Sequence, residues 1–170
     1  MRTSTNIFVG FGVACLVAAC SVGMQPRAKA AQVAQTQCAD ARMSQDDIRL
    51  LQTTTVLSAQ PVYAHVHTNT NEEERVSGAK LLIRPPDGVS AERLAGILQC
   101  HSARVLLGQV DMSRFADDPT WLPDAWVDID VKPEGGNFAV TLSSDTVAKN
   151  LQVLERASAF ADTHHNSATQ

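Results

Sequence analysis

The stretch that decides the fold is WVDIDVKPEGGNFAVTL, residues 126–142. Its apolar residues Val127, Ile129 and Val131 alternate with polar or charged neighbours, and the alternation resumes after PEGG, residues 133–136. Successive side chains of a strand point to opposite faces of the sheet, so this pattern indicates strands with one buried face. Because Gly-Gly favours a tight turn between antiparallel strands, the sequence predicts a β-hairpin here.

The same kinds of pattern occur once earlier in the chain. The predicted order of elements is strands at 62–68 and 79–84, a helix at 90–107, strands at 126–132 and 137–142, and a helix at 144–161. A short additional helix is expected to begin near Ser44, which starts a capping box. This order predicts an α+β fold: a two-layer sandwich in which a four-stranded antiparallel sheet carries two helices on one face.

Each long helix is predicted to bury one apolar stripe. The stripe of the first helix comprises Leu94, Ile97, Leu98, His101 and Val105, and that of the second comprises Val147, Leu151, Leu154 and Ser158. The opposite, open face of the sheet is expected to carry Tyr63, His65, His67, Trp126, Asp128 and Asp130. Since His101 falls within its apolar stripe, we expect it to be packed, with a satisfied ring nitrogen.

The first thirty residues have the features of an export signal. Arg2 is followed by a stretch without charge, residues 7–24, that ends in small residues. Two cleavage sites are present: one after residue 19, and an A-x-A site at residues 28–30 that would place the signal at 1–30. The sequence predicts export and leaves the choice between these sites open.

The first of these sites resembles a known processing motif. Val17-Ala18-Ala19-Cys20 resembles the lipobox of bacterial lipoproteins, at the end of the apolar core. The resemblance implies that residues 1–19 are the signal peptide and that Cys20 is lipidated. It also implies a lipid anchor on the periplasmic face of the outer membrane, because Ser21 rather than Asp follows the cysteine. Processing at the A-x-A site would instead give a soluble periplasmic or secreted protein.

The remaining chain divides by composition into three parts. Residues 20–43 are rich in Ala and Gln without apolar periodicity, which indicates a flexible tether. A single α+β domain is expected at 44–162, followed by a disordered tail at 163–170. Cys38 and Cys100 are an even pair after processing, and in an oxidising compartment the expected outcome is a disulfide between them.

His65 and His67 are the candidate metal ligands. They lie two positions apart in a predicted strand and therefore project from one face, a start for a Zn²⁺ or Cu²⁺ site. Asp128 or Asp130 would be further ligands if the two strands were neighbours. The alternative is that both histidines are solvated side chains, because protein zinc sites use three or four ligands.

Three aromatic residues are candidates for partner binding: Trp121, Trp126 and Tyr63. Trp121 lies in a long loop between two prolines, and the alternative is that it folds back over the sheet edge. The net charge of −4 and the lack of a basic run argue against nucleic acid as a partner. No nucleophile-elbow, zincin, P-loop or dinucleotide fingerprint occurs in the chain. We therefore expect no enzyme activity and no cofactor.

Residues 125–160 resemble the BON modules of bacterial envelope proteins, in which a tight hairpin also runs into a helix. The resemblance implies association with phospholipid or another envelope component. Together with the lipobox, it leads us to expect a non-enzymatic envelope lipoprotein with a small binding or structural domain, anchored to the membrane through its lipid. The alternative is a periplasmic metal-binding protein that uses His65 and His67.

Overall fold

The computed structural model describes residues 25–38, 45–67, 72–110 and 117–165. These ranges contain helices α1 (Pro26–Gln37), α2 (Gln45–Thr53), α3 (Ala91–Leu106) and α4 (Val147–His165), and strands β1 (Val56–His67), β2 (Glu72–Ile83), β3 (Asp128–Glu134) and β4 (Asn137–Ser143). Residues 1–24, which include Cys20 and the predicted cleavage site after residue 19, lie outside these ranges, whereas the A-x-A site at residues 28–30 lies within helix α1. No helix among the described residues is long and apolar enough to cross a membrane.

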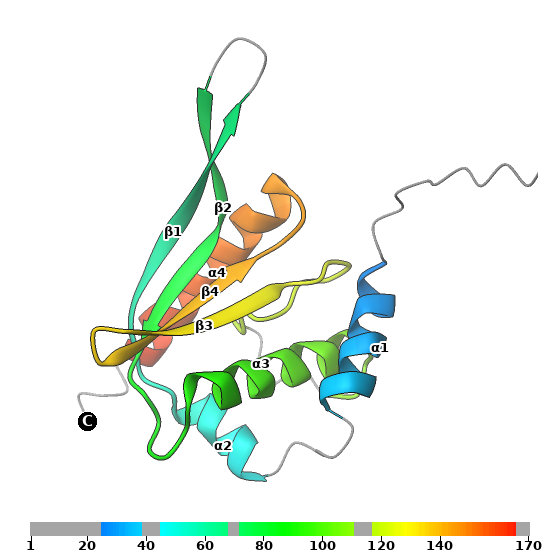
Figure 1. Cartoon of the computed structure of the whole chain (residues 1–170), viewed down its shortest axis with the longest axis vertical. Helices are drawn as coiled ribbons and strands as arrows, with labels where there is room; N and C mark the ends of the chain where they lie inside the picture. Colours follow the sequence, from blue (N-terminus) through cyan, green and yellow to red (C-terminus); the bar gives the residue numbers. More distant parts are fainter. Residues whose placement is uncertain (1–24, 39–44, 68–71, 111–116, 166–170) are drawn as a thin grey trace, which may run out of the picture.

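The strands form one antiparallel sheet in the order β1-β2-β4-β3, which confirms the predicted α+β fold (Figure 1). The predicted hairpin is present as β3 and β4, and Gly135 and Gly136 form its turn with positive φ angles of 59° and 81°. Such angles fit the two central residues of a hairpin turn that matches the twist of its strands. The strand order places β1 and β3 at opposite edges of the sheet.

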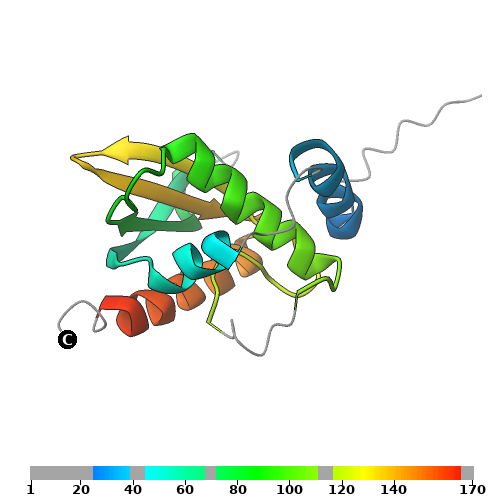
Figure 2. The ribbon, with the colours of Figure 1, turned by 90° about the horizontal axis from the view of Figure 1, so that it is seen from below.

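Both long helices pack on one face of this sheet, where they build a single core (Figure 2). α3 lies over β3, and α4 lies mainly over β1 and β2. α3 contributes Leu94 and Leu98, whereas α4 contributes Val153 and Ala157. α2 adds partly buried leucines at the edge of this core.

The buried face of α4 matches the predicted one only at Leu154, which is partly buried against the core. Its buried residues are Asn150, Val153, Ala157 and Ala161. Val147 and Leu151, predicted to face the core, are exposed. The apolar pattern missed this face because it includes the polar residue Asn150. The Asn150 side chain accepts a hydrogen bond from the backbone N–H of Ser144 and donates one to the Ser144 carbonyl, and these two bonds hold the start of the helix.

β1 and β2 are longer than predicted and extend beyond the sheet as a two-stranded arm (Figure 1). β2 pairs with β4 only from Ala79 to Ile83, whereas it pairs with β1 as far as Glu72. Residues 72–78, which fall between the predicted strands at 62–68 and 79–84, therefore belong to β2. The sequence pattern did not predict this part of β2, because its residues are mostly charged. A two-stranded ribbon with both faces in solvent does not need alternating apolar residues.

The expected tether at 20–43 contains helix α1, so the prediction of a flexible segment was wrong for residues 26–37. Alanine is the strongest helix former and Pro26 occupies a favourable first position, although the helix has no apolar stripe. α1 lies against α3 (Figure 2). At the other end of the chain, α4 continues to His165, three residues into the predicted tail; residues 166–170 lie outside the described ranges.

Candidate functional site

A cavity of about 250 Å³ lies between the sheet and the helical layer. Its apolar walls come from both layers, with Leu81 and Val140 of the sheet facing Leu94 and Leu98 of α3. Phe160 of α4 closes one side. The cavity is partly open to solvent, because exposed residues such as Asp117 and Thr163 lie at its rim. Small-molecule sites are typically concave and mostly apolar in this way. The cavity is therefore the leading candidate for a ligand site.

One wall of the cavity is polar and is built around His101 and Asp118. His101 is 1% exposed, and its Nε2 lies 2.5 Å from Asp118 Oδ2. An ionised carboxylate only accepts hydrogen bonds, so Nε2 donates. Thr120 donates to the other carboxylate oxygen through both its backbone N–H and its hydroxyl, at 2.8 and 2.7 Å. These three bonds fix the carboxylate and position the segment that follows it.

The prediction that His101 is packed with a satisfied ring nitrogen is confirmed. Its partner Asp118 was missed, because the two residues are separated by seventeen positions and no local pattern links them. The only sequence signal is the run Asp118-Pro119-Thr120, in which an aspartate side chain commonly bonds the backbone two residues ahead. This wall also includes Asp117, which is exposed, and His164 of α4.

Trp121 folds back with its loop onto α4. The guanidinium of Arg156 lies 4.9 Å from the centre of the Trp121 ring, and Arg156 Nη1 donates to the Trp121 carbonyl at 3.3 Å. The stacking and the hydrogen bond together hold residues 117–121 over the helix. Of the two alternatives for Trp121, the observed contacts fit the one in which the side chain folds back onto the domain. The ring covers α4, however, and not the sheet edge that was predicted.

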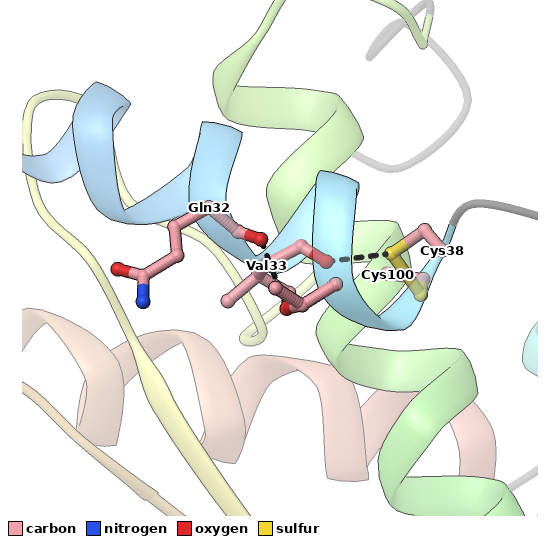
Figure 3. Close-up of a disulfide and its surroundings, with 5 residues drawn as sticks. Gln32, Val33, Cys38 and Cys100 are labelled. Carbon is pink, nitrogen blue, oxygen red and sulfur yellow. Dashed lines mark hydrogen bonds between the residues drawn. A yellow bond between two sulfur atoms is a disulfide. The ribbon is translucent and has the colours of Figure 1, made fainter.

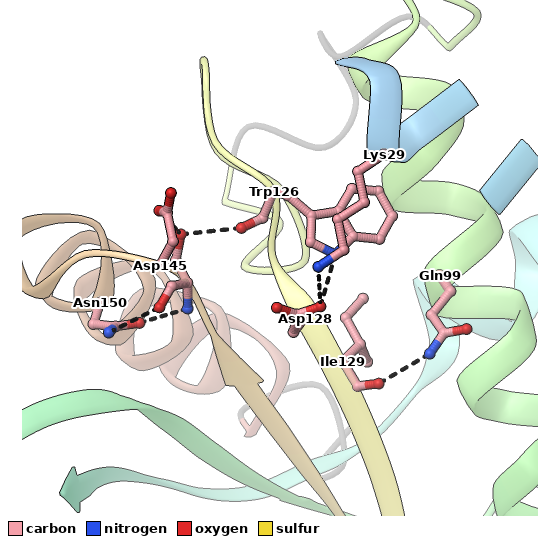
Figure 4. A network of polar contacts seen from close by, with 8 residues as sticks. Lys29, Gln99, Trp126, Asp128, Ile129, Asp145 and Asn150 are labelled. Atoms are coloured by element: carbon pink, nitrogen blue, oxygen red, sulfur yellow. Dashed lines mark hydrogen bonds and ion pairs between the residues drawn. The ribbon is translucent and has the colours of Figure 1, made fainter. Parts of the chain in front are cut away.

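Trp126 is buried, at 8% exposure, so its predicted place on the open face was wrong. It packs between Ala30 of α1 and Ala103 of α3. Its Nε1 donates to Asp128 Oδ1 at 2.9 Å, and Lys29 Nζ binds the same oxygen at 2.7 Å (Figure 4). The alternating pattern of β3 does not apply to Trp126, because this residue precedes the strand. Its ring is covered by α1, in a segment that was predicted to be a flexible tether.

Cys38 and Cys100 are bonded in the structure, with their Cα atoms 5.7 Å apart (Figure 3). Both are buried. The bond joins the end of α1 to the middle of α3, so it holds the first described helix against the domain. The pairing is the one predicted from the cysteine count.

His65 and His67 lie on the arm, far along β1 from the cavity, and both are exposed. Glu72 Oε1 is 4.0 Å from His65 Nδ1 and 3.7 Å from His67 Nε2, and Glu74 Oε1 is 3.9 Å from His65 Nε2. Among the described residues, no group of three or more His, Cys, Asp or Glu is arranged to hold a metal ion. The two histidines therefore lie beside glutamates of the neighbouring strand on an exposed ribbon.

Asp128 and Asp130 do not join the two histidines, because β1 and β3 are opposite edges of the sheet. Asp128 binds Lys29, and Asp130 pairs with Lys132 on its own strand at 2.6 Å. Tyr63, the third predicted partner-binding aromatic residue, is exposed on β1, at 52%. Its predicted place on the open face was wrong, because Pro61, two positions earlier on the same side of the strand, pairs with the buried, core-facing Ala79.

No family model, no curated protein and no solved structure matches this chain.

Proposed function

We propose that this chain is a non-enzymatic envelope lipoprotein whose domain binds a small amphipathic ligand in the cavity between its two layers. The observation that carries the proposal is the apolar cavity of about 250 Å³ with a fixed polar group at one wall. An apolar cavity of about 150 Å³ is enough to bind benzene. Small-molecule sites in proteins are typically apolar with a few precisely placed polar groups, which is the arrangement here.

The charges at the polar wall define the class of head group. Among the described residues that line the cavity, Asp117 and Asp118 are acidic and none is a lysine or an arginine. A carboxylate or phosphate at this wall would meet negative charge, whereas a hydroxyl or an amine could donate to the acidic oxygens. The ligand that fits best is thus a short acyl or alkyl chain with a neutral or cationic head.

Processing at Cys20, rather than after Ala30, agrees with the contacts of α1. Cleavage after Ala30 would remove Lys29, which binds Asp128, and Ala30 itself, which is fully buried against Trp126 and Ala103. Cleavage before Cys20 keeps both contacts. This supports a chain that begins with a lipidated cysteine and remains at the periplasmic face of the outer membrane.

The test is a titration of the processed chain with decan-1-ol, decylamine and decanoate, followed by NMR chemical shifts. We expect the alcohol and the amine to shift resonances of cavity residues, and decanoate to bind at least tenfold more weakly. The absence of saturable shifts at the cavity with all three compounds would refute the proposal.

Val140 and Val131 provide a matched pair of variants. They are cross-strand partners in the core, but only Val140 lines the cavity. We expect Val140→Phe to fold, because the ring can occupy the cavity, and to lose ligand binding. Val131→Phe has no such space and should lose about 1–3 kcal/mol of stability by overpacking while retaining binding in the folded fraction.

The alternative function, metal binding through His65 and His67, stays a prediction without support from an observed third ligand.

A further inference from the structure

Val147 and Leu151 of α4, which the sequence analysis assigned to the core, are instead exposed on one side of the helix. Of the large hydrophobic side chains in the described ranges, the exposed ones are Val147, Leu151 and Tyr63, at 42%, 50% and 52% exposure. Val147 and Leu151 are four positions apart and so lie on one face of α4. Apolar side chains clustered on a surface mark interaction sites, whereas scattered ones do not.

This flank of α4 borders the edge of the sheet formed by β1, which no other described strand covers. Residues 56–59 of β1 and Ser158, Ala161 and Asp162 of α4 line a shared groove of about 520 Å³. The C-terminal half of α4 therefore lies beside the start of β1, and α4 runs antiparallel to this strand. Its N-terminal half, with Val147 and Leu151, lies towards the arm (Figure 1).

The β1 edge lacks the charges that protect the other edge of the sheet. The outer strand β3 carries Asp128, Asp130, Lys132 and Glu134 and also a proline, features that discourage pairing with another chain. The corresponding stretch of β1, LSAQPVYA at residues 57–64, has no charge at all. Among the described strands β1 pairs only with β2. Pro61 removes one donor from this edge, so a new ladder would form mainly along residues 57–60.

We propose that the β1 edge and the adjoining flank of α4 bind an extended segment of a partner protein, which pairs with β1 as an additional antiparallel strand. Strand addition to a free edge provides main-chain hydrogen bonds, and alternate side chains of the new strand would rest on α4. Antiparallel pairing places the N-terminal end of the segment near Tyr63 and Leu151 and its C-terminal end near Asp162. The first part of the segment should therefore be apolar.

Charge complementarity defines the second part of the segment. Among the described residues, the exposed flank of α4 carries the acidic side chain of Glu155 and no basic residue on the same side of the helix. A segment with Lys or Arg after its apolar part would place positive charge beside Glu155. A second copy of this chain fits less well, because pairing β1 with β1 would bring the two acidic flanks together.

The direct test uses the processed full chain and a labelled peptide, acetyl-TVTLTATRTK-amide, whose alternate side chains are apolar and then basic. We expect saturable binding by fluorescence anisotropy, and at least tenfold weaker binding of the acidic counterpart acetyl-TVTLTATETE-amide. A version of the first peptide with N-methylated amides at alternate positions keeps the side chains but loses backbone donors. It should bind at least tenfold more weakly when its methyl groups face β1.

Leu151→Gln should weaken peptide binding at least fivefold, and Gln152→Ala, at the neighbouring exposed position, should not. Equal binding of the basic and acidic peptides, no binding of either, or no effect of N-methylation would overturn the proposal. A concentration-dependent dimer that Leu151→Gln abolishes would also overturn it and assign this surface to a second copy. Binding of decan-1-ol in the cavity is expected to be unchanged by Leu151→Gln, so the two proposals succeed or fail separately.

Discussion

His101 Nε2 and Asp118 Oδ2 lie 2.5 Å apart in the interior, and this bond joins α3 to the segment that closes the cavity. Asp118 also accepts two bonds from Thr120, so a single carboxylate organises the polar wall. The backbone carbonyl of the same residue accepts from Arg156 Nη1 of α4 at 3.4 Å. Asp118 therefore links the loop to both long helices.

Asp118→Asn is expected to destabilise the domain by about 2–3 kcal/mol, since hydrogen bonds to a charged group contribute about 1.5–3 kcal/mol and the amide would turn a donor towards His101. Urea unfolding followed by circular dichroism measures this loss. Asp117→Asn is the matched control at the adjacent exposed position, and we expect it to change stability by less than about 0.5 kcal/mol. Equal effects of the two variants would contradict the role assigned to Asp118.

Replacing Cys38 and Cys100 together by serine should lower stability by about 4 kcal/mol, the chain-entropy value for a bridge between residues 62 positions apart. Without the bridge, the described contacts that still hold α1 are the packing of Ala30 and Val33 and the contacts of Lys29 with Asp128 and Trp126. We therefore expect amide hydrogens of residues 26–37 to exchange much faster than those of β4 under native conditions. Unchanged protection of α1 in the double variant would mean that the bridge is not what holds it.

Gly78 and Gly96 should respond oppositely to alanine. A Cβ at Gly78 would lie 2.1 Å from the carbonyl oxygen of Leu142, and its φ of 155° is one that other residues rarely adopt. Gly96 lies within α3 with open space around it. Gly78→Ala should cost more than about 2 kcal/mol, whereas Gly96→Ala should add about 0.5–1 kcal/mol, the difference in helix propensity. Thermal unfolding of both variants decides whether β2 and β4 approach as closely as described.

The fold was predictable where local pattern and tertiary packing agree. The β3–β4 hairpin alternates cleanly because each strand has one buried face, and α3 shows its buried stripe for the same reason. α1 was not predictable, because its alanines give no apolar stripe and its position depends on Trp126, about a hundred residues away in the chain. Nor could sequence reveal the cavity, which depends on how closely α2, α3 and α4 approach the sheet.

α3 begins at a cap whose contribution depends on pH. Ser90 Oγ accepts a hydrogen bond from the backbone N–H of Arg93 at 3.2 Å. The pKa of Glu92 is lowered, first by a hydrogen bond from its own backbone N–H and second by one from the Ser90 side chain. A carboxyl group whose pKa is lower in the folded state stabilises that state above its unfolded pKa. This stabilisation is lost as pH falls through the folded pKa.

Ser90→Ala should therefore have two effects. The loss of the cap is expected to cost about 1 kcal/mol at neutral pH. The pKa of Glu92 should rise towards its ordinary value, because one of its two donors is removed, and an NMR titration of the Glu92 carboxyl resonance measures that change. Ser158→Ala serves as the control, since Ser158 bonds only within α4, to the carbonyl of Leu154, and does not contact Glu92. An unchanged Glu92 titration in Ser90→Ala would show that the hydroxyl does not donate to this carboxylate and that the backbone N–H alone lowers its pKa.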